Sequence, residues 1–240
     1  MDDAIDHRAL LGRFQSAFLA DVPGTDPRAP VPACGRWRVR NLVEHLGRIH
    51  HWAAGQARRR QETPLGRGPF DLPAFYAEQA AELRAALDEL DPDARAWTLL
   101  PTDDPRSTVR FWHRRQTHET LVHLHDLRAA SGRTVGDVPP TVWADTVDEV
   151  VTVVQPRQVR LGRMTALERP VALVADDAAT SWVLGARDDV LPAVRVTAPA
   201  RTLALVLWRR VAPDPDAVDG LTVEGDVSAL DAALGARLTP

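Results

Sequence analysis

The stretch FWHRRQTHETLVHLHDLRAA, residues 111–130, decides the fold of the chain. Residues three or four positions apart share one face of a helix. One face of this helix would therefore carry Trp112, Gln116, Glu119, His123 and Asp126. An ordinary bundle helix turns leucine and valine inward. A polar face of this kind indicates a chemical site inside a helical bundle.

Glu119 and His123 are four positions apart, so their side chains project together. A carboxylate oxygen and an imidazole nitrogen form a pair that divalent first-row metals accept. The third ligand must come from another helix. His45 is the best candidate, because it lies beside an apolar stripe on its own helix. Three protein ligands leave positions open for water or substrate, as at catalytic metal sites.

The alternative is that this spacing marks only a surface contact between Glu119 and His123. His45 would then be a histidine at the edge of the core. The other histidines, His7, His50, His51, His113, His118 and His125, are expected mostly on solvated faces. His51 is the most interesting of them, because it follows His45 on the same helix and precedes Trp52.

Three more helices are expected before the quoted stretch. The first has an apolar stripe over residues 10–18 and the second over residues 39–53, and the third begins at the N-cap Asp71. Prolines break residues 91–106 into a long connection. The fourth helix should begin near Ser107 and stop at Ser131-Gly132. This order predicts an up-and-down style four-helix bundle over residues 1–135.

The second part of the chain predicts a small α+β domain over residues 141–240, after a linker with Gly136, Pro139 and Pro140. A helix is expected over residues 142–154, another over 200–210, and a last one from Asp226. Strands are expected over residues 170–175, 181–184, 194–197 and 221–224. The predicted fold class is therefore α+β: an N-terminal four-helix bundle followed by a small α+β domain.

Composition narrows the classes of function. The 240 residues are 45% hydrophobic and 26% charged, as in a soluble globular protein. No apolar run is long enough for a membrane helix, and the acidic N-terminus does not look like a secretory signal. A net charge of -4 argues against a nucleic-acid partner. The single Cys34 excludes an internal disulfide, and we expect a cytoplasmic protein. All 29 cationic side chains are arginines, a bias typical of a GC-rich, actinobacterial type of genome.

Four motifs resemble one family. They are WRVRNLVEHL (residues 37–46), RRQTHETLVHLHD (114–126), LALVLWRR (203–210) and VEGD (223–226). They are similar to the mycothiol-dependent maleylpyruvate isomerase family, which belongs to the DinB-like group of four-helix metalloenzymes. The resemblance spans nearly the whole chain and implies a DinB-like bundle with a small C-terminal domain that closes over the site.

The resemblance also implies a ligand set and a cosubstrate. The ligands would be His45, Glu119 and His123, the metal zinc, and the cosubstrate the thiol mycothiol. Arg210 matches the family's arginine after tryptophan and would hold an anionic group, with a solvated arginine as the alternative. Arg209 stands where the family usually has glycine. Asp126 would orient a ligand, with a cap or an Arg115 salt bridge as the alternative.

A metal ion would turn a bound thiol into a nucleophilic thiolate at neutral pH. Such a thiolate could add to an activated double bond, allow rotation and leave again, which is isomerisation. It could also attack an electrophilic carbon and stay attached to it, which is S-transfer. The expected protein is a monomer or homodimer that takes a small electrophile and a low-molecular-weight thiol. The alternative is a non-catalytic metal- or thiol-sensing regulatory module. A metal-dependent hydrolase is a third reading, with Asp126 or His51 as its only possible bases.

Overall fold

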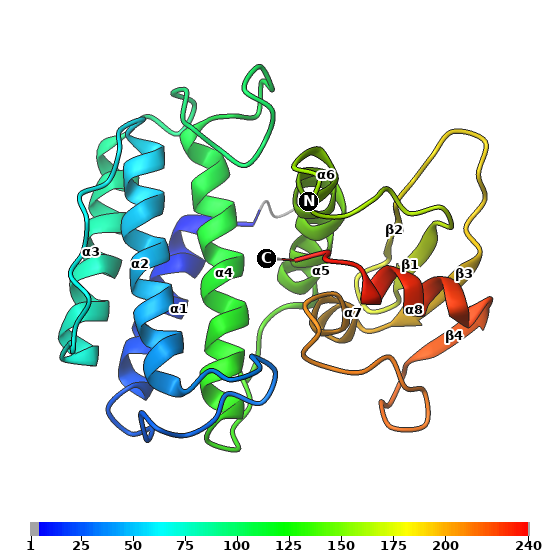
Figure 1. Ribbon diagram of the computed structural model, residues 1–240, viewed down its shortest axis with the longest axis horizontal. Helices are drawn as coiled ribbons and strands as arrows, with labels where there is room; N and C mark the ends of the chain where they lie inside the picture. The colour runs from blue at the N-terminus through cyan, green and yellow to red at the C-terminus, as the bar shows by residue number, and fades with distance from the viewer. Residues whose placement is uncertain (1–4, 240) are drawn as a thin grey trace. The chain divides into compact units, whose positions relative to one another are not determined.

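The structure is a computed structural model, and it describes residues 5–239. The chain forms two compact units, one that ends at Gly136 and one that begins at Asp137 (Figure 1). The first unit is helical, and the second combines helices with a four-stranded sheet. The predicted α+β class, a helical bundle followed by a small mixed domain, is confirmed. No helix within residues 5–239 has both the length and the apolar character needed to cross a membrane.

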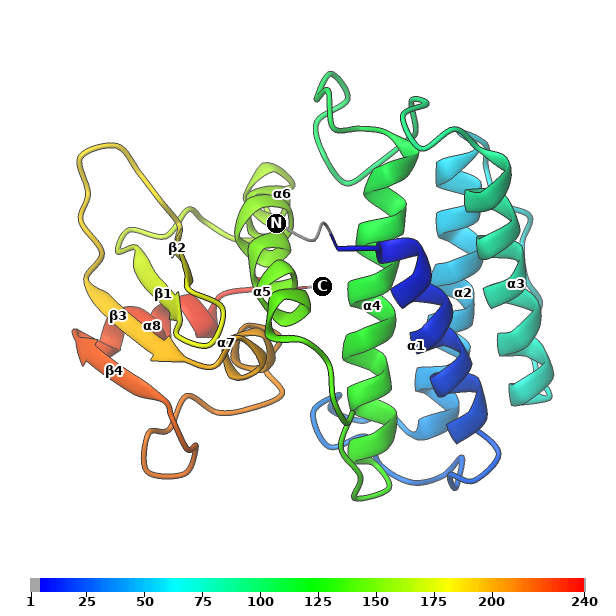
Figure 2. The same ribbon diagram turned by 180° about the vertical axis from the view of Figure 1, so that it is seen from behind.

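The first unit is a bundle of four helices, and their bounds are α1 His7–Asp21, α2 Val39–Ala57, α3 Leu72–Glu89 and α4 Val109–Ala129. In both views α2 lies between α3 and α4 (Figures 1 and 2). The apolar stripes of the sequence form the core, because Leu11, Leu42, Leu46 and Leu83 are almost completely buried. The Asp71 carboxylate caps α3 by accepting a hydrogen bond from the backbone N–H of Ala74 at 2.9 Å.

The helices do not follow a simple up-and-down order, and this prediction was wrong. An ion pair of 2.9 Å between Arg58 and Glu89 joins the C-terminal ends of α2 and α3, so these two helices are parallel. The C-terminal ends of α1 and α4 are likewise joined by Arg128 and Asp21, at 2.7 Å. Residues 58–71 connect the parallel pair. An extended chain spans at most about 3.3–3.6 Å per residue, so residues 58–71 are long enough to run back from the C-terminal end of α2 to its N-terminal end, where α3 begins.

Helix α4 begins at Val109, two residues later than predicted. The hydroxyl of Ser107 is hydrogen-bonded to that of Thr98 at 2.8 Å, so Ser107 belongs to the connection before the helix. Inside the helix, Trp112 is completely buried, and its indole N–H donates to the Trp97 carbonyl at 2.8 Å. The long connection between α3 and α4 is therefore fixed to the bundle by hydrogen bonds.

The second unit begins with helices α5 Pro140–Glu149 and α6 Gln155–Arg160, which are joined by the π-helical turn η1 Val150–Val154. The predicted helix over residues 142–154 is therefore too short. The π-helical turn ends at Val154, two residues before Pro156, which has no backbone N–H to donate. The wider turn accommodates the proline and lets the chain continue as helix.

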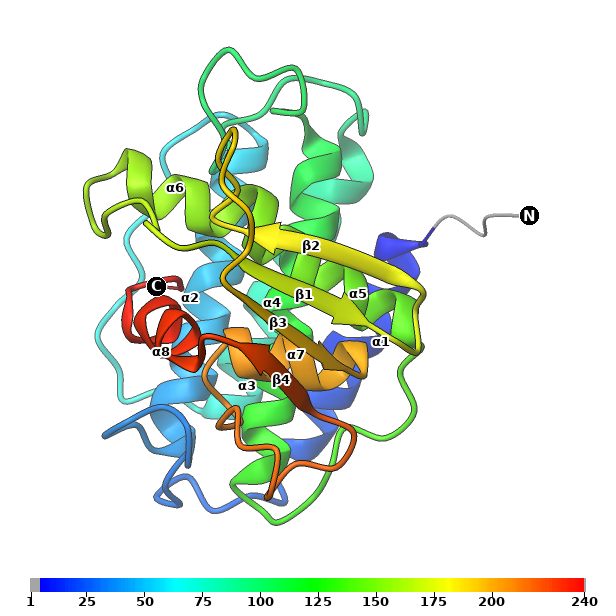
Figure 3. The ribbon, with the colours of Figure 1, turned by 90° about the vertical axis from the view of Figure 1, so that its right-hand side faces the viewer.

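The four strands of the sheet are β1 Val171–Ala175, β2 Thr180–Leu184, β3 Val194–Ala198 and β4 Thr222–Gly225. Their order is β2-β1-β3-β4, and only the β1–β3 pair is parallel (Figure 3). Neighbouring residues of β1 are buried, so both faces of this strand are covered. Helices α7 Ala200–Leu207 and α8 Val227–Gly235 both pack against β1 and β3.

Helix α7 ends at Leu207, although the sequence predicted a helix to residue 210. The backbone N–H of Arg210 donates to the Leu205 carbonyl at 2.7 Å, and that of Arg209 donates to Val206 at 2.9 Å. This pair of bonds is a Schellman motif, which terminates a helix. Arg209 occupies its left-handed position with φ 60°, where glycine has the least strain. The family's usual glycine at this position is therefore explained by the left-handed backbone conformation, which glycine adopts without strain.

Candidate metal centre

The candidate metal centre is formed by two neighbouring helices of the first unit. His45 lies in the second turn of α2, and Glu119 and His123 lie one turn apart on α4. Because α2 packs directly against α4, the three side chains meet between these helices. One ligand atom from each residue lies within 4.8 Å of the other two. The structure thus brings together the three residues that the sequence singled out.

The two distances from the Glu119 carboxylate match those between ligands of a tetrahedral metal ion. The carboxylate Oε1 of Glu119 lies 3.2 Å from His123 Nε2 and 3.5 Å from His45 Nε2. Bonds of about 2.0–2.1 Å to zinc would separate two tetrahedral ligand atoms by about 3.3 Å. The side chain of His45 is 32% exposed, whereas those of Glu119 and His123 are about 10% exposed. The cluster is therefore buried on the α4 side and accessible at His45.

Glu119 is held as a carboxylate. Burial alone would raise its pKa, but the neighbouring Arg115 guanidinium and the two histidines hold the pKa well below the usual range. Arg115 pairs with Oε2, so Oε1 remains directed toward the histidines. Arg115 is itself only 6% exposed, which makes this a buried ion pair on α4. From the sequence, Arg115 was expected only as an alternative partner of Asp126.

Asp126 is hydrogen-bonded to His123. Its Oδ2 lies 2.9 Å from His123 Nδ1, so a proton on Nδ1 is donated to the carboxylate and Nε2 faces Glu119. A carboxylate behind the far nitrogen is the usual support of a metal-binding histidine. Burial lowers the pKa of His123, but the Asp126 and Glu119 carboxylates outweigh it and raise the pKa to about 9. The surroundings of His123 therefore favour a positive charge.

The turn over residues 31–37 supports the cluster from outside the bundle. Backbone hydrogen bonds fold it closely, from Cys34 to the Val31 carbonyl and from Trp37 to the Cys34 carbonyl. The thiol Sγ of Cys34 lies 3.6 Å from Oδ2 of Asp126. The Trp37 ring packs on the His45 ring, with their centroids 4.8 Å apart. No local pattern in the sequence predicts either contact, although Trp37 begins the motif that contains His45.

Most of the remaining histidines are buried, contrary to the expectation of solvated faces. His50, His51, His113 and His118 are at most 7% exposed. His50 shows how a buried histidine is accommodated, because its Nδ1 is hydrogen-bonded to the amide oxygen of Gln116 at 2.8 Å. Burial lowers its pKa to about 4 even though the Gln116 bond opposes this, so His50 is neutral at pH 7. Gln116 on the polar face of α4 therefore serves packing between helices.

His51 is engaged at both ring nitrogens. Its Nδ1 lies 2.5 Å from the Glu82 carboxylate, and its Nε2 lies 2.7 Å from the Thr63 carbonyl oxygen. Because both partners are acceptors, the doubly protonated ring satisfies both. Burial alone would lower the pKa of His51, but Glu82 and Thr63 outweigh it and raise the pKa. His51 thus joins α2, α3 and their connection through both ring nitrogens, which leaves it poorly suited to act as a base.

This geometry sets the sign of a pH effect on stability. The charged His51 is favoured in the folded protein, so its contribution is complete below the unfolded pKa of about 6.5 and is lost as pH rises through the raised folded pKa. We expect His51→Gln to destabilise the protein about 1 kcal/mol more at pH 6 than at pH 9. Urea unfolding at the two pH values measures this difference. An equal destabilisation at both would contradict a charged His51.

Arg210 belongs to the second unit. Its guanidinium donates to the Trp208 carbonyl at 2.6 Å and lies over the Trp208 ring, with Cζ 6.0 Å from the ring centroid. Arg209 is exposed and strained, whereas Arg210 is half-buried and held in place. Of the two arginines, Arg210 therefore has the more defined position.

The fold and the cluster define a class: a four-helix bundle with a candidate metal centre, followed by a small α+β domain. Residues 8–128 match the family model described as the mycothiol maleylpyruvate isomerase N-terminal domain. The chain belongs to the mycothiol maleylpyruvate isomerase family. The resemblance recognised in the motifs is thereby confirmed.

Two solved structures share the fold over nearly their whole length. The crystal structure of the mycothiol-dependent maleylpyruvate isomerase matches with a TM-score of 0.61 at 15% sequence identity, over 92% of this chain and 93% of that one. A histidine-to-alanine mutant of that isomerase matches with a TM-score of 0.62 at the same identity and coverage. No curated protein matches the sequence. At this identity, the likeness shows the fold alone.

Proposed function

We propose that this protein is a metal- and mycothiol-dependent isomerase of small electrophiles, with maleylpyruvate as the first substrate to test. The observation that carries the proposal is the cluster of His45, Glu119 and His123, whose ligand atoms lie within 4.8 Å of one another in a member of this family. The exposure of His45 supports a site that small molecules can reach, as an enzyme needs and a closed sensor site does not.

The donor set supports zinc as the metal. Two imidazole nitrogens and one carboxylate form a common zinc environment, and three protein ligands leave a fourth position open. A zinc ion held there would lower the pKa of a thiol that binds at this position, and so supply a thiolate at neutral pH. In this proposal mycothiol provides the sulfur, as the family's description indicates.

The protein's own residues prepare the site. Arg115 fixes the orientation of Glu119 and keeps it ionised. Asp126 fixes the ring of His123, and Trp37 packs on His45, so the ligands are preorganised. We assign to Arg210 the binding of an anionic group of substrate or thiol. A planar guanidinium suits a carboxylate, which it can bind through two parallel hydrogen bonds.

One experiment distinguishes isomerisation from S-transfer. Purified protein with zinc and mycothiol is incubated with a panel of small electrophiles that includes maleylpyruvate, and products are read by mass spectrometry. An isomerase leaves the mass of the substrate unchanged, whereas a transferase adds the mass of mycothiol. We expect an unchanged mass with altered retention. A lack of any thiol-dependent product with zinc bound would overturn the enzymatic proposal.

Because Asp126 supports His123, a substitution of Asp126 should weaken metal binding even though all three proposed ligands remain in place. We expect Asp126→Asn to weaken zinc binding about 10–100-fold, because the neutral amide supports His123 less well than the carboxylate. Competition with a chromophoric chelator measures the affinity. Asp88→Asn is the control, because that carboxylate pairs with Arg8 at the surface and should leave zinc affinity unchanged. Equal affinities in the two variants would contradict the role of Asp126.

A further inference from the structure

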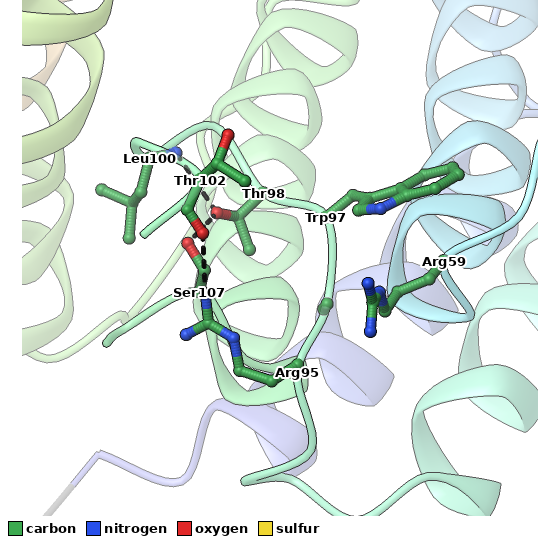
Figure 4. Close-up of a pocket in the computed structure, with 8 residues that line it drawn as sticks. Arg59, Arg95, Trp97, Thr98, Leu100, Thr102 and Ser107 are labelled. Atoms are coloured by element: carbon green, nitrogen blue, oxygen red, sulfur yellow. Dashed lines mark hydrogen bonds between the residues drawn. The ribbon is translucent and has the colours of Figure 1, made fainter. Parts of the chain in front are cut away.

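A cavity of about 280 Å³ lies at the end of the bundle where α2 ends and α4 begins (Figure 4). Its walls come from the turn after α2 and from the connection between α3 and α4. With a rise of 1.5 Å per residue, Arg58 at the end of α2 lies roughly 20 Å along the helix from His45. The cavity is therefore separate from the candidate metal centre, and the proposed function does not use it.

The cavity is positively charged. Arg59 and Arg95 line it, and none of the described lining residues is acidic. Arg95 donates to the backbone carbonyls of Asp104 at 2.8 Å and Thr102 at 2.9 Å, which hold its guanidinium in place. The Asp104 carboxylate itself is engaged by Arg106. The Arg95 charge is thus fixed in the wall by neutral partners.

Arg59 supplies the second charge from an unfavourable backbone position. Its N–H donates to Gln56 and that of Arg60 to Gly55, which forms a Schellman motif at the end of α2. Arg59 occupies the left-handed position of this motif with φ 54°, where glycine is the usual residue. Within residues 5–239 its side chain has no hydrogen bond or ion pair. Figure 4 shows the Arg59 side chain beside the Trp97 ring.

Trp97 offers a flat apolar surface beside this guanidinium. Its backbone N–H donates to the Gln56 carbonyl at 3.1 Å, and its own carbonyl accepts the indole N–H of Trp112 at 2.8 Å. The residue is therefore anchored on both sides, yet 44% of its surface is exposed. An anchored tryptophan with an exposed ring is suited to stack a planar group. An adjacent unpaired guanidinium is suited to bind a carboxylate.

We propose that this cavity is a second binding site, for a small planar carboxylate of about the size of benzoate. The carboxylate pairs with Arg59, and the planar group lies against Trp97. The volume supports a small ligand, because cavities for drug-sized molecules range from about 300 to 1,000 Å³. Arg95 adds a fixed positive charge without needing to move.

The test is an NMR titration of the full-length protein with benzoate, read at the indole N–H signal of Trp97, which Trp97→Phe assigns. We expect a saturable shift of that signal. Arg59→Gly should raise the dissociation constant at least about tenfold, because a charge-assisted contact is lost. The variant should keep or raise the melting temperature, since glycine relieves the left-handed strain. Arg60→Ala removes the neighbouring charge from an exposed residue outside the cavity lining and should leave binding unchanged.

Benzamide, which has the same ring and no charge, should bind far more weakly than benzoate. The proposal is overturned if Arg59→Gly binds benzoate as tightly as the wild type, or if benzamide binds as tightly as benzoate. It is also overturned if benzoate saturates the protein without moving the Trp97 signal. Each of these results is independent of metal binding at His45, Glu119 and His123.

Discussion

Replacing His123 by alanine should remove the metal ion from the protein. The substitution deletes one of three protein ligands and leaves Glu119 and His45 as an incomplete pair. Loss of a residue that only supports a ligand costs about 10–100-fold in affinity, so loss of the ligand itself should cost more than about 100-fold. Metal analysis of purified protein should give about one zinc per wild-type chain and almost none per His123→Ala chain.

His51→Gln is the matched control for this experiment. It replaces a histidine of α2 whose two nitrogens are already engaged by Glu82 and Thr63. This variant should keep full zinc occupancy. If His123→Ala retained about one zinc per chain, the cluster would not be the metal site, although the fold would stand.

The second large effect concerns stability in the absence of metal. Glu119→Gln removes the carboxylate from a buried ion pair with Arg115. Removal of one partner of a buried pair typically costs about 3–5 kcal/mol, because the remaining charge stays buried and loses the attraction of the carboxylate. We expect the free energy of unfolding, measured in urea with a chelator present, to fall by this amount.

Glu89→Gln provides the surface counterpart. The Glu89 side chain is 66% exposed and pairs with Arg58 at 2.9 Å. An exposed pair of this kind contributes about 0–1 kcal/mol, so the control variant should be nearly as stable as the wild type. A Glu119→Gln variant that loses no more stability than Glu89→Gln would show that Arg115 is not stabilised by this carboxylate.

The amino-acid sequence predicted the elements of the site that follow from helical periodicity. Glu119 and His123 meet because four residues make about one helical turn, and His45 faces them because it adjoins the apolar stripe of α2. The bundle followed by a mixed domain was predictable from the change in periodicity after residue 135. These inferences depend on local patterns, which the chain preserves when it folds.

Other features depended on contacts that no local pattern encodes. Cys34 reaches Asp126 only because the turn over residues 31–37 folds onto the end of α4. The parallel course of α2 and α3 depends on the path of residues 58–71. Buried histidines were assigned to the surface because their partners, such as Gln116 for His50, come from other helices. A polar side chain can be buried whenever such a partner is present.

The two strained arginines illustrate the same limit. Arg59 and Arg209 both occupy left-handed positions after a helix, where the sequence offers no glycine to mark the end. The end of α7 was consequently placed too late. Neither composition nor periodicity marks an arginine that adopts a left-handed backbone conformation. Only the structure shows that such a residue ends the helix.

The central claim is that the cluster on α2 and α4 holds a metal that serves a thiol-dependent isomerisation. The most direct test measures the conversion of maleylpyruvate by the zinc-loaded protein, with and without mycothiol. The account predicts conversion to an isomer of equal mass only when mycothiol is present. Conversion at the same rate without any thiol would contradict it.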